Sequence, residues 1–230
     1  MLESAGVTLG MKEGKYDDLL TVNSTAPFER LLVLPTNPHG IVQTRAIEGA
    51  VAEVRDRGAL LGIEDLERDV FLAIWQKIKE VYPAKVWSKY PDSRLLMNVS
   101  IVSLTAFILE TMVAKQRMED EPVDYSSIAV LGKVVERVVS RIPSEFWQTE
   151  WKLKELDTSS GRQSVQEALG VIDSNVRYGR PWYERVSLVD PAAVEESAPE
   201  AKRLHRTSAK KSAAKKVAAA KKIVRRSTNS

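Results

Sequence analysis

Cysteine is absent from this chain of 230 residues, and histidine occurs only twice, at His39 and His205. Without cysteine the chain can form no disulfide, no thiolate metal site and no thiol nucleophile. The two histidines lie towards opposite ends of the sequence, and His39 stands in an Asn-Pro-His-Gly stretch with no visible partner. We therefore predict no metal site and no cofactor.

Catalytic motifs are missing as well. The segment SSGRQS lacks the Gly-Lys-Ser/Thr ending of a phosphate-binding loop, and GMKEGK lacks the second half of such a motif. An acidic cluster occurs at Glu64, Asp65, Glu67 and Asp69, where it coincides with a predicted helix start. Carboxylates in that position stabilise the helix dipole. No catalytic residue can be assigned, and the chain is more typical of a non-enzyme than of an enzyme.

Membrane signals are weak. The longest apolar stretch, residues 95–113, is almost long enough to cross a bilayer but contains Asn98, Ser103 and Glu110. This pattern favours a buried core helix. The first residues lack the basic and then apolar pattern of a secretory signal. We expect a cytoplasmic protein, with association to the nucleoid as an option, and no membrane contact.

What the sequence does have is an uneven distribution of charge. Residues 201–230 hold eleven Lys or Arg and no Asp or Glu, which leaves 23 basic and 31 acidic residues in the first 200. The formal charge is therefore +11 in the last thirty residues and −8 in the rest. A folded acidic region joined to a basic arm is typical of contact with nucleic acid or with a membrane surface.

We call residues 201–230 the basic segment. Its lysines are separated by alanine and valine, and its like charges repel one another, so we expect it to be disordered when free and able to become helical on a phosphate lattice. Lysines meet phosphates without reading bases, which predicts sequence-nonspecific contact with DNA or RNA. An anionic membrane surface and a merely solubilising role remain as alternatives. The predicted nucleic-acid-binding residues are Lys202, Arg203, Arg206, Lys210, Lys211, Lys215, Lys216, Lys221, Lys222, Arg225 and Arg226.

The rest of the chain predicts a mainly α fold, a compact domain of about six helices. In the second helix, for example, Val70, Ile74 and Ile78 recur every four residues and form one apolar face. Residues 15–34 carry two short apolar runs around a turn, which could be short strands or the start of a helix. We favour a minor strand or irregular structure at this N-terminal end. The helices are expected over residues 40–58, 64–82, 93–118, 125–141, 144–156 and 164–176.

Composition also predicts the domain limits. Residues 1–190 form the acidic helical domain, and residues 191–200, rich in Ala, Glu, Ser and Pro, form a linker that cannot bury enough apolar surface to become ordered. The basic segment follows this linker.

The five tryptophans offer candidate stacking surfaces for bases. Four of them lie in or beside predicted amphipathic helices and are better explained as core residues. The exception lies in the sequence GRPWYERV, where aromatic and arginine side chains alternate outside a regular helix. Such a stretch could serve as a contact surface, formed by Arg180, Trp182, Tyr183 and Arg185.

Several landmarks occur in a familiar order: TAPFERLLVLP, FLAIWQKIKEVYPAKVWSKY, LLMNVSIVSLTAFILE, SEFWQTEWKLKEL and SSGRQSVQEAL. Over residues 25–175 they resemble the C-terminal half of the DGQHR-domain proteins, which include the DndB-type regulators of DNA phosphorothioate modification. Trp75, Ile78 and Trp87 match the family's aromatic helix and turn, and residues 95–109 match its apolar helix. The Asp-Gly-Gln-His-Arg motif itself is absent, so the resemblance implies a split or truncated member and carries over no functional residue.

Two functions from different classes follow. The first is a non-enzymatic DNA-associated accessory or regulatory protein, whose helical body binds a protein partner while the basic segment holds it on nucleic acid. The second is one half of a split DNA-modification or nuclease-type enzyme of the DGQHR or ParB-like class, with its catalytic half on another chain. A helical interaction module with an incidental basic segment is a third and less specific interpretation.

Overall fold

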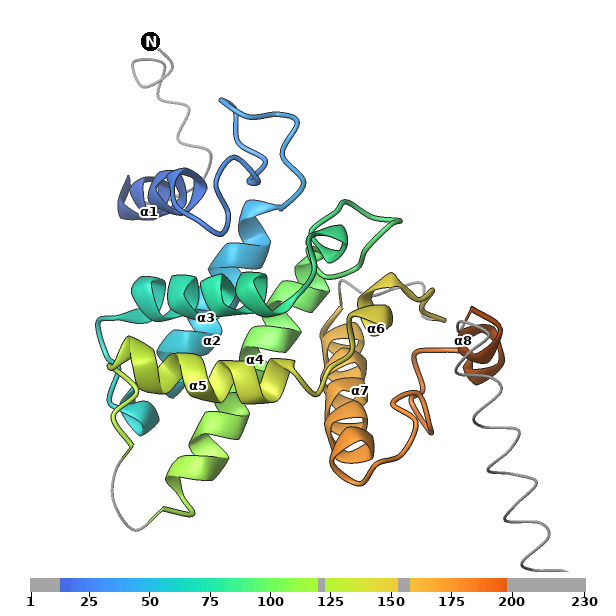
Figure 1. Cartoon of the computed structure of the whole chain (residues 1–230). Helices are drawn as coiled ribbons and strands as arrows, with labels where there is room; N and C mark the ends of the chain where they lie inside the picture. Colours follow the sequence, from blue (N-terminus) through green and yellow to red (C-terminus); the bar gives the residue numbers. More distant parts are fainter. Residues whose placement is uncertain (1–12, 120–122, 153–157, 198–230) are drawn as a thin grey trace, which may run out of the picture. The chain divides into compact units, whose positions relative to one another are not determined.

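The computed structural model describes residues 13–119, 123–152 and 158–197 of the chain. Backbone contacts divide the chain into two units, Met1–Val189 and Asp190–Ser230. The described part of the first unit is helical, which confirms the predicted mainly α fold (Figure 1). Its elements are α1 (Glu13–Ser24), α2 (Thr44–Leu61), α3 (Glu67–Val81), the 3₁₀ turn η2 (Ala84–Val86), α4 (Asn98–Gln116), α5 (Ile128–Val139), α6 (Ser144–Gln148) and α7 (Ser159–Arg177).

Helix α4 is the central helix of the first unit, packed against α2 and against α7. By length and composition alone it could cross a membrane, yet 61% of its apolar window is buried inside the unit, as predicted for a core helix. The buried Ser100 hydroxyl has no hydrogen-bond partner among the described residues, whereas the buried Thr105 hydroxyl is paired twice. Thr105 donates to the carbonyl of Ile101 at 2.8 Å and accepts a hydrogen bond from Trp75 Nε1 at 3.0 Å. Such pairing lets a helix that is buried on nearly all sides carry polar residues without a desolvation cost.

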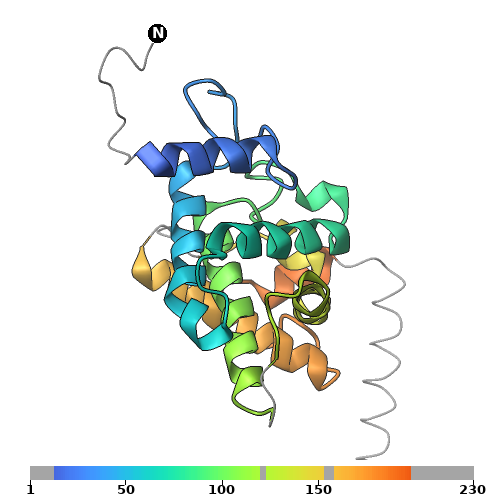
Figure 2. The ribbon, with the colours of Figure 1, turned by 90° about the vertical axis from the view of Figure 1, so that its left-hand side faces the viewer.

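Helices α3 and α5 lie side by side in the same unit, and α3 also packs on α2 (Figures 1 and 2). The predicted apolar face of α3 is correct, because Val70, Ile74 and Ile78 are all buried. Helix α5 buries Leu131 and Val135 in the same way. Its first residue, Ile128, has the same spacing but is 74% exposed.

Aromatic residues fill two parts of the core. Phe28, Phe71 and Trp75 form one cluster, with Phe28 and Phe71 stacked at 5.4 Å between ring centres. Phe146 and Trp151 stack in the other at 5.0 Å. Three of the four tryptophans predicted to be core residues are buried, and the fourth, Trp87, is half-buried at the edge of the first cluster.

The N-terminal expectation for residues 15–34 was wrong in its first half. Helix α1 extends to Ser24, where only Leu19 and Val22 are buried among the residues whose side chains are described, so the apolar pattern that normally reveals a helix is short. Beyond it the chain is irregular, as expected. Its backbone forms only isolated bridges between Leu32 and Val42 and between Leu34 and Asn37. Gly40 is required here, since a Cβ would lie 2.2 Å from the carbonyl oxygen of Leu32.

Three helix ends also differ from their predicted positions. Helix α2 continues past Gly58, and Gly62 ends it in a left-handed conformation with φ of 66°. Helix α6 ends at Gln148, well before residue 156. Helix α7 begins at Ser159, before the predicted start at residue 164, because the Thr158 hydroxyl accepts a hydrogen bond from the Gly161 amide at 3.0 Å and caps the helix.

In the second unit, residues 191–197 were expected to be part of an unstructured linker, but they form the helix α8 (Pro191–Ser197). Proline suits the first position of a helix, where no backbone donor is needed. The Asp190 carboxylate accepts a hydrogen bond from the Ala192 amide at 3.1 Å, which supplies a start signal that composition alone does not reveal.

Candidate interaction surfaces

The predicted nucleic-acid-binding residues of the basic segment, Lys202 to Arg226, lie outside the described residues. Their assignment rests on charge and spacing in the sequence. The second predicted contact, in the sequence GRPWYERV, lies within the described residues and can be built from its backbone upwards.

Helix α7 ends in a turn that fixes the following residues. Gly179 takes a left-handed conformation with φ of 66°, the Gly179 amide donates to the carbonyl of Val176, and the Arg180 amide donates to the carbonyl of Asn175 at 2.8 Å. This pair of bonds is the Schellman motif, which glycine favours because it has no side chain to clash. The chain therefore leaves α7 in one defined direction.

Asn175 holds the next residues in place. Its side-chain amide donates to the carbonyl of Trp182 at 3.1 Å and to that of Glu184 at 2.6 Å, and the residue itself is 5% exposed. Together with the bond from Arg180, three backbone positions are tied to one buried asparagine. We call residues 177–185 the arginine loop, since it holds Arg177, Arg180 and Arg185.

The aromatic residues of the arginine loop differ in exposure. Trp182 is half-buried, with its ring 6.0 Å from that of Phe146 in an edge-to-face contact and 5.5 Å from that of Tyr183. It therefore anchors the loop to the core. Tyr178 is 74% exposed, and the Arg180 guanidinium lies 5.7 Å from the centre of its ring. The sequence prediction omitted Tyr178, although its position just before a helix-ending glycine could have indicated it.

Arg177 of this loop meets one further arginine, Arg141, at a buried carboxylate. Asp173 of α7 accepts from Arg141 Nη1 at 3.1 Å and from Arg177 Nη2 at 2.8 Å. The Asp173 side chain is 11% exposed, while those of Arg141 and Arg177 are 26% and 50% exposed. Two guanidinium groups thus share one carboxylate, and the cluster carries a net positive charge. Arg177 also lies in the last turn of α7, where a cation stabilises the helix dipole.

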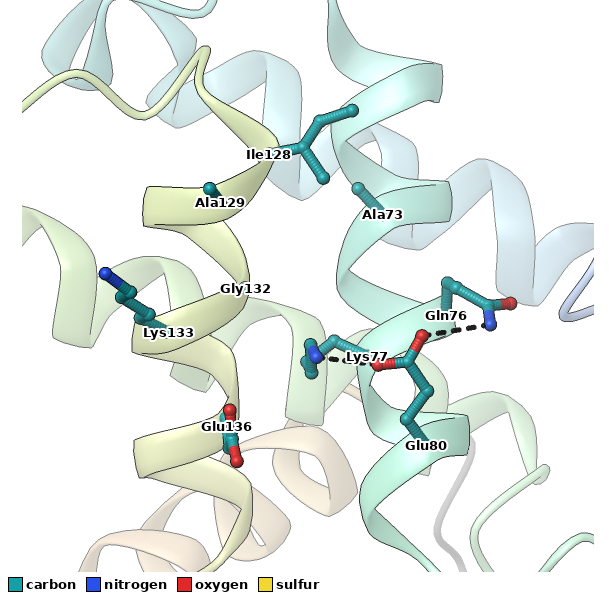
Figure 3. A pocket seen from close by; sticks show the side chains of 9 residues that line it. All are labelled: Ala73, Gln76, Lys77, Glu80, Ile128, Ala129, Gly132, Lys133 and Glu136. Carbon is teal, nitrogen blue, oxygen red and sulfur yellow. Dashed lines mark hydrogen bonds and ion pairs between the residues drawn. The ribbon is translucent and has the colours of Figure 1, made fainter.

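A second surface feature is a groove of about 290 Å³ between α3 and α5 (Figure 3). Its lining includes small residues, among them Ala73 and Gly132, and Ile128 contributes an exposed side chain. We call it the α3/α5 groove. Its lining residues are Ala73, Gln76, Lys77, Glu80, Ile128, Ala129, Gly132, Lys133 and Glu136.

The charges of the α3/α5 groove balance one another. Lys77 Nζ lies 2.6 Å from Glu80 Oε2, and Gln76 donates to the same carboxylate at 3.2 Å. The bond from Lys77 lowers the pKa of the Glu80 carboxyl, and it raises the pKa of Lys77. Two lysines and two glutamates therefore give a groove of zero formal charge, with neither histidine nor a hydroxyl nucleophile among its lining residues.

Metal-binding and catalytic constellations were not expected. Over residues 13–119, 123–152 and 158–197 no group of three or more His, Asp or Glu side chains could hold a metal ion. In the predicted acidic cluster, Glu67 and Asp69 occupy the first turn of α3, and Glu67 pairs with Arg55 of α2 at 3.6 Å.

Comparisons of the chain with protein-family models, with curated proteins and with solved structures give no match. The resemblance to the DGQHR-domain proteins stays a prediction.

Proposed function

We propose that this protein is a non-enzymatic, DNA-associated accessory protein whose acidic helical body is held on nucleic acid by the basic segment. The observation that carries the proposal is the distribution of charge, +11 in residues 201–230 and −8 in the first 200. All 31 Asp and Glu lie in the first 200 residues, and the last thirty residues contain none. Nucleic acid carries closely spaced phosphates, so it is the polyanion that such a run of lysines is best suited to bind.

In this proposal the basic segment and the helical body have different roles. Lysines that neutralise phosphates release counterions, which gives affinity without base recognition. The body then supplies specificity by binding a protein partner, and attachment to DNA raises the local concentration of that partner. The DNA-modification setting implied by the family resemblance belongs to this proposal, as does a cytoplasmic location.

The experiment compares the full chain with a variant in which the seven lysines of the basic segment are replaced by glutamine. Binding to a fluorescent 20-base-pair duplex is measured by anisotropy across a salt series. If all seven lysines contact phosphates, the slope of log affinity against log salt becomes shallower by about 6, at about 0.9 per contact. Four arginines remain in the segment, so weak binding persists.

A matched control replaces seven exposed lysines and arginines of the body with glutamine, which changes the net charge by the same amount. This control is expected to keep nearly all of the salt slope. Unchanged binding of the segment variant would contradict the proposal. Binding of the wild-type chain to anionic vesicles but not to DNA would instead favour the membrane alternative.

A further inference from the structure

The arginine loop is a positively charged exception on an acidic body. Residues 177–185 contain three arginines and a single acid, Glu184, whereas the first 200 residues have a net charge of −8. Arg180 and Arg185 are both exposed. They follow the last residue of α7, so the helix dipole that accounts for Arg177 does not account for them.

The loop is also held more firmly than an ordinary surface connection. The three backbone bonds to Asn175, at 2.8, 3.1 and 2.6 Å, fix residues 180–184, and the Trp182 ring fixes the loop against Phe146. Arg180 lies over the ring of Tyr178, and Arg177 is paired with Asp173. A guanidinium fork that is already positioned loses less entropy when it binds an anion than one on a mobile chain.

Arg185 has an unusual backbone. Its φ is 61°, in the left-handed region where asparagine and glycine are favoured over long side chains. An arginine in that conformation is placed there at a local cost, and its exposed side chain makes no contribution to the core. Backbone strain of this kind is often found at functional positions.

We propose that Arg177, Arg180 and Arg185 form a preorganised phosphate-binding surface, a second contact between this protein and the backbone of nucleic acid. This inference rests on the proposed function and adds a folded contact to the basic segment. Arginine suits the role because its planar group donates two parallel hydrogen bonds to one phosphate. Trp182 serves as the anchor of the loop, and the exposed ring of Tyr178 positions Arg180.

The test uses the full chain carrying Arg180→Gln and Arg185→Asn together. Duplex affinity is measured by anisotropy from 50 to 300 mM salt. Loss of two phosphate contacts is expected to make the slope of log affinity against log salt shallower by about 1.8, at about 0.9 per contact. Asparagine tolerates the left-handed backbone, so the substitution at position 185 should not lower the melting temperature of the protein.

Two further variants make the result specific. Lys89→Gln with Arg117→Gln removes two exposed positive charges elsewhere on the body and should leave the slope unchanged. Arg180→Lys with Arg185→Lys keeps the charges and should keep most of the slope. An effect equal to that of the Lys89 and Arg117 control would show that only net charge matters and would overturn the inference.

The seven-lysine variant of the basic segment separates this inference from the proposed function. If that variant loses affinity while the Arg180 and Arg185 variant matches wild type, the loop inference fails and the proposed function stands. If the seven-lysine variant binds as wild type does while the loop variant is weakened, the proposed role of the segment fails and the loop contact stands. A wild-type chain that binds no duplex at any salt would overturn both.

Discussion

The body and the basic segment use charge in opposite ways. In the body, several cations are held by neighbouring acids; Arg57, for example, pairs with Glu53 at 2.5 Å and with Glu110 at 3.0 Å. The basic segment has no acid within its own thirty residues to pair with, and it has no aromatic residue. All five tryptophans belong to the body. Stability should therefore depend on the packing of the body, and salt-dependent affinity on the charges of the segment.

The sharpest test of this separation is Trp75→Ala. Trp75 is fully buried against the stacked rings of Phe28 and Phe71, and its indole donates to Thr105 at 3.0 Å. Removing so large a side chain from the core should lower the free energy of unfolding by about 3–5 kcal/mol. Urea unfolding monitored by circular dichroism measures the loss, with Trp75→Phe as a milder control.

At a temperature where the Trp75→Ala variant is still folded, its DNA salt slope should equal that of wild type. A changed slope would show that the body and the basic segment are not energetically independent. It would contradict the proposal that stability and salt-dependent affinity depend on different regions.

Asp173→Asn tests a site where the stability of the body and its affinity for DNA should change together. The substitution removes the carboxylate shared by Arg141 and Arg177, which should cost about 2 kcal/mol of stability, as expected for hydrogen bonds to charged groups. It also removes a negative charge beside the arginine loop, so duplex affinity should rise. Glu167→Gln, an exposed site on the same helix, is the control for charge alone. An equal gain in affinity from both variants would argue against a local effect.

The fold could be predicted where a helix buries a broad stripe. Val70, Ile74 and Ile78 revealed α3 because four-residue spacing leaves little choice of structure. Helix α1 was not favoured because, among its residues whose side chains are described, only Leu19 and Val22 are buried, and they give too short a period. Helix ends depend on single capping contacts, such as that between Thr158 and Gly161, which hydrophobic periodicity does not report.

The candidate surfaces were predictable only in part. Alternating arginine and aromatic residues indicated the loop, but which ring is exposed depends on packing between distant residues, here Trp182 against Phe146. The α3/α5 groove could not be predicted, because it requires knowing which helices lie side by side. Ile128 fits the apolar period of α5 and is nevertheless exposed at the border of this groove, because the period does not show how closely the partner helix packs.

Tyr82→Phe probes the packing of the body through pH. The Tyr82 hydroxyl donates to the carbonyl of Ile142 at 3.0 Å, and losing that bond should cost about 1 kcal/mol. Burial raises the pKa of Tyr82 above its ordinary value of 10.0. Above about pH 10 the unfolded chain loses this proton while the folded chain keeps it, so stability falls by about 1.4 kcal/mol per pH unit.

The Tyr82→Phe variant should therefore lose stability less steeply than wild type between pH 10 and 11. Burial also raises the pKa of Tyr125, which stays in place, so some slope should remain in the variant. If the curves of stability against pH ran parallel for variant and wild type, the alkaline effect could not be assigned to Tyr82.

The smallest expected effects come from two helical glycines. At Gly170 of α7 an added Cβ would meet no atom within 4 Å, so Gly170→Ala should raise stability by about 0.5–1 kcal/mol through helix propensity. At Gly132 of α5 a Cβ would lie 3.3 Å from Lys77 Cε, so the Lys77 side chain, which pairs with Glu80, would have to shift. Gly132→Ala should therefore gain less than Gly170→Ala in thermal melts. Equal gains would mean that the Lys77–Glu80 pair on the groove contributes nothing to the body, which is common for exposed ion pairs.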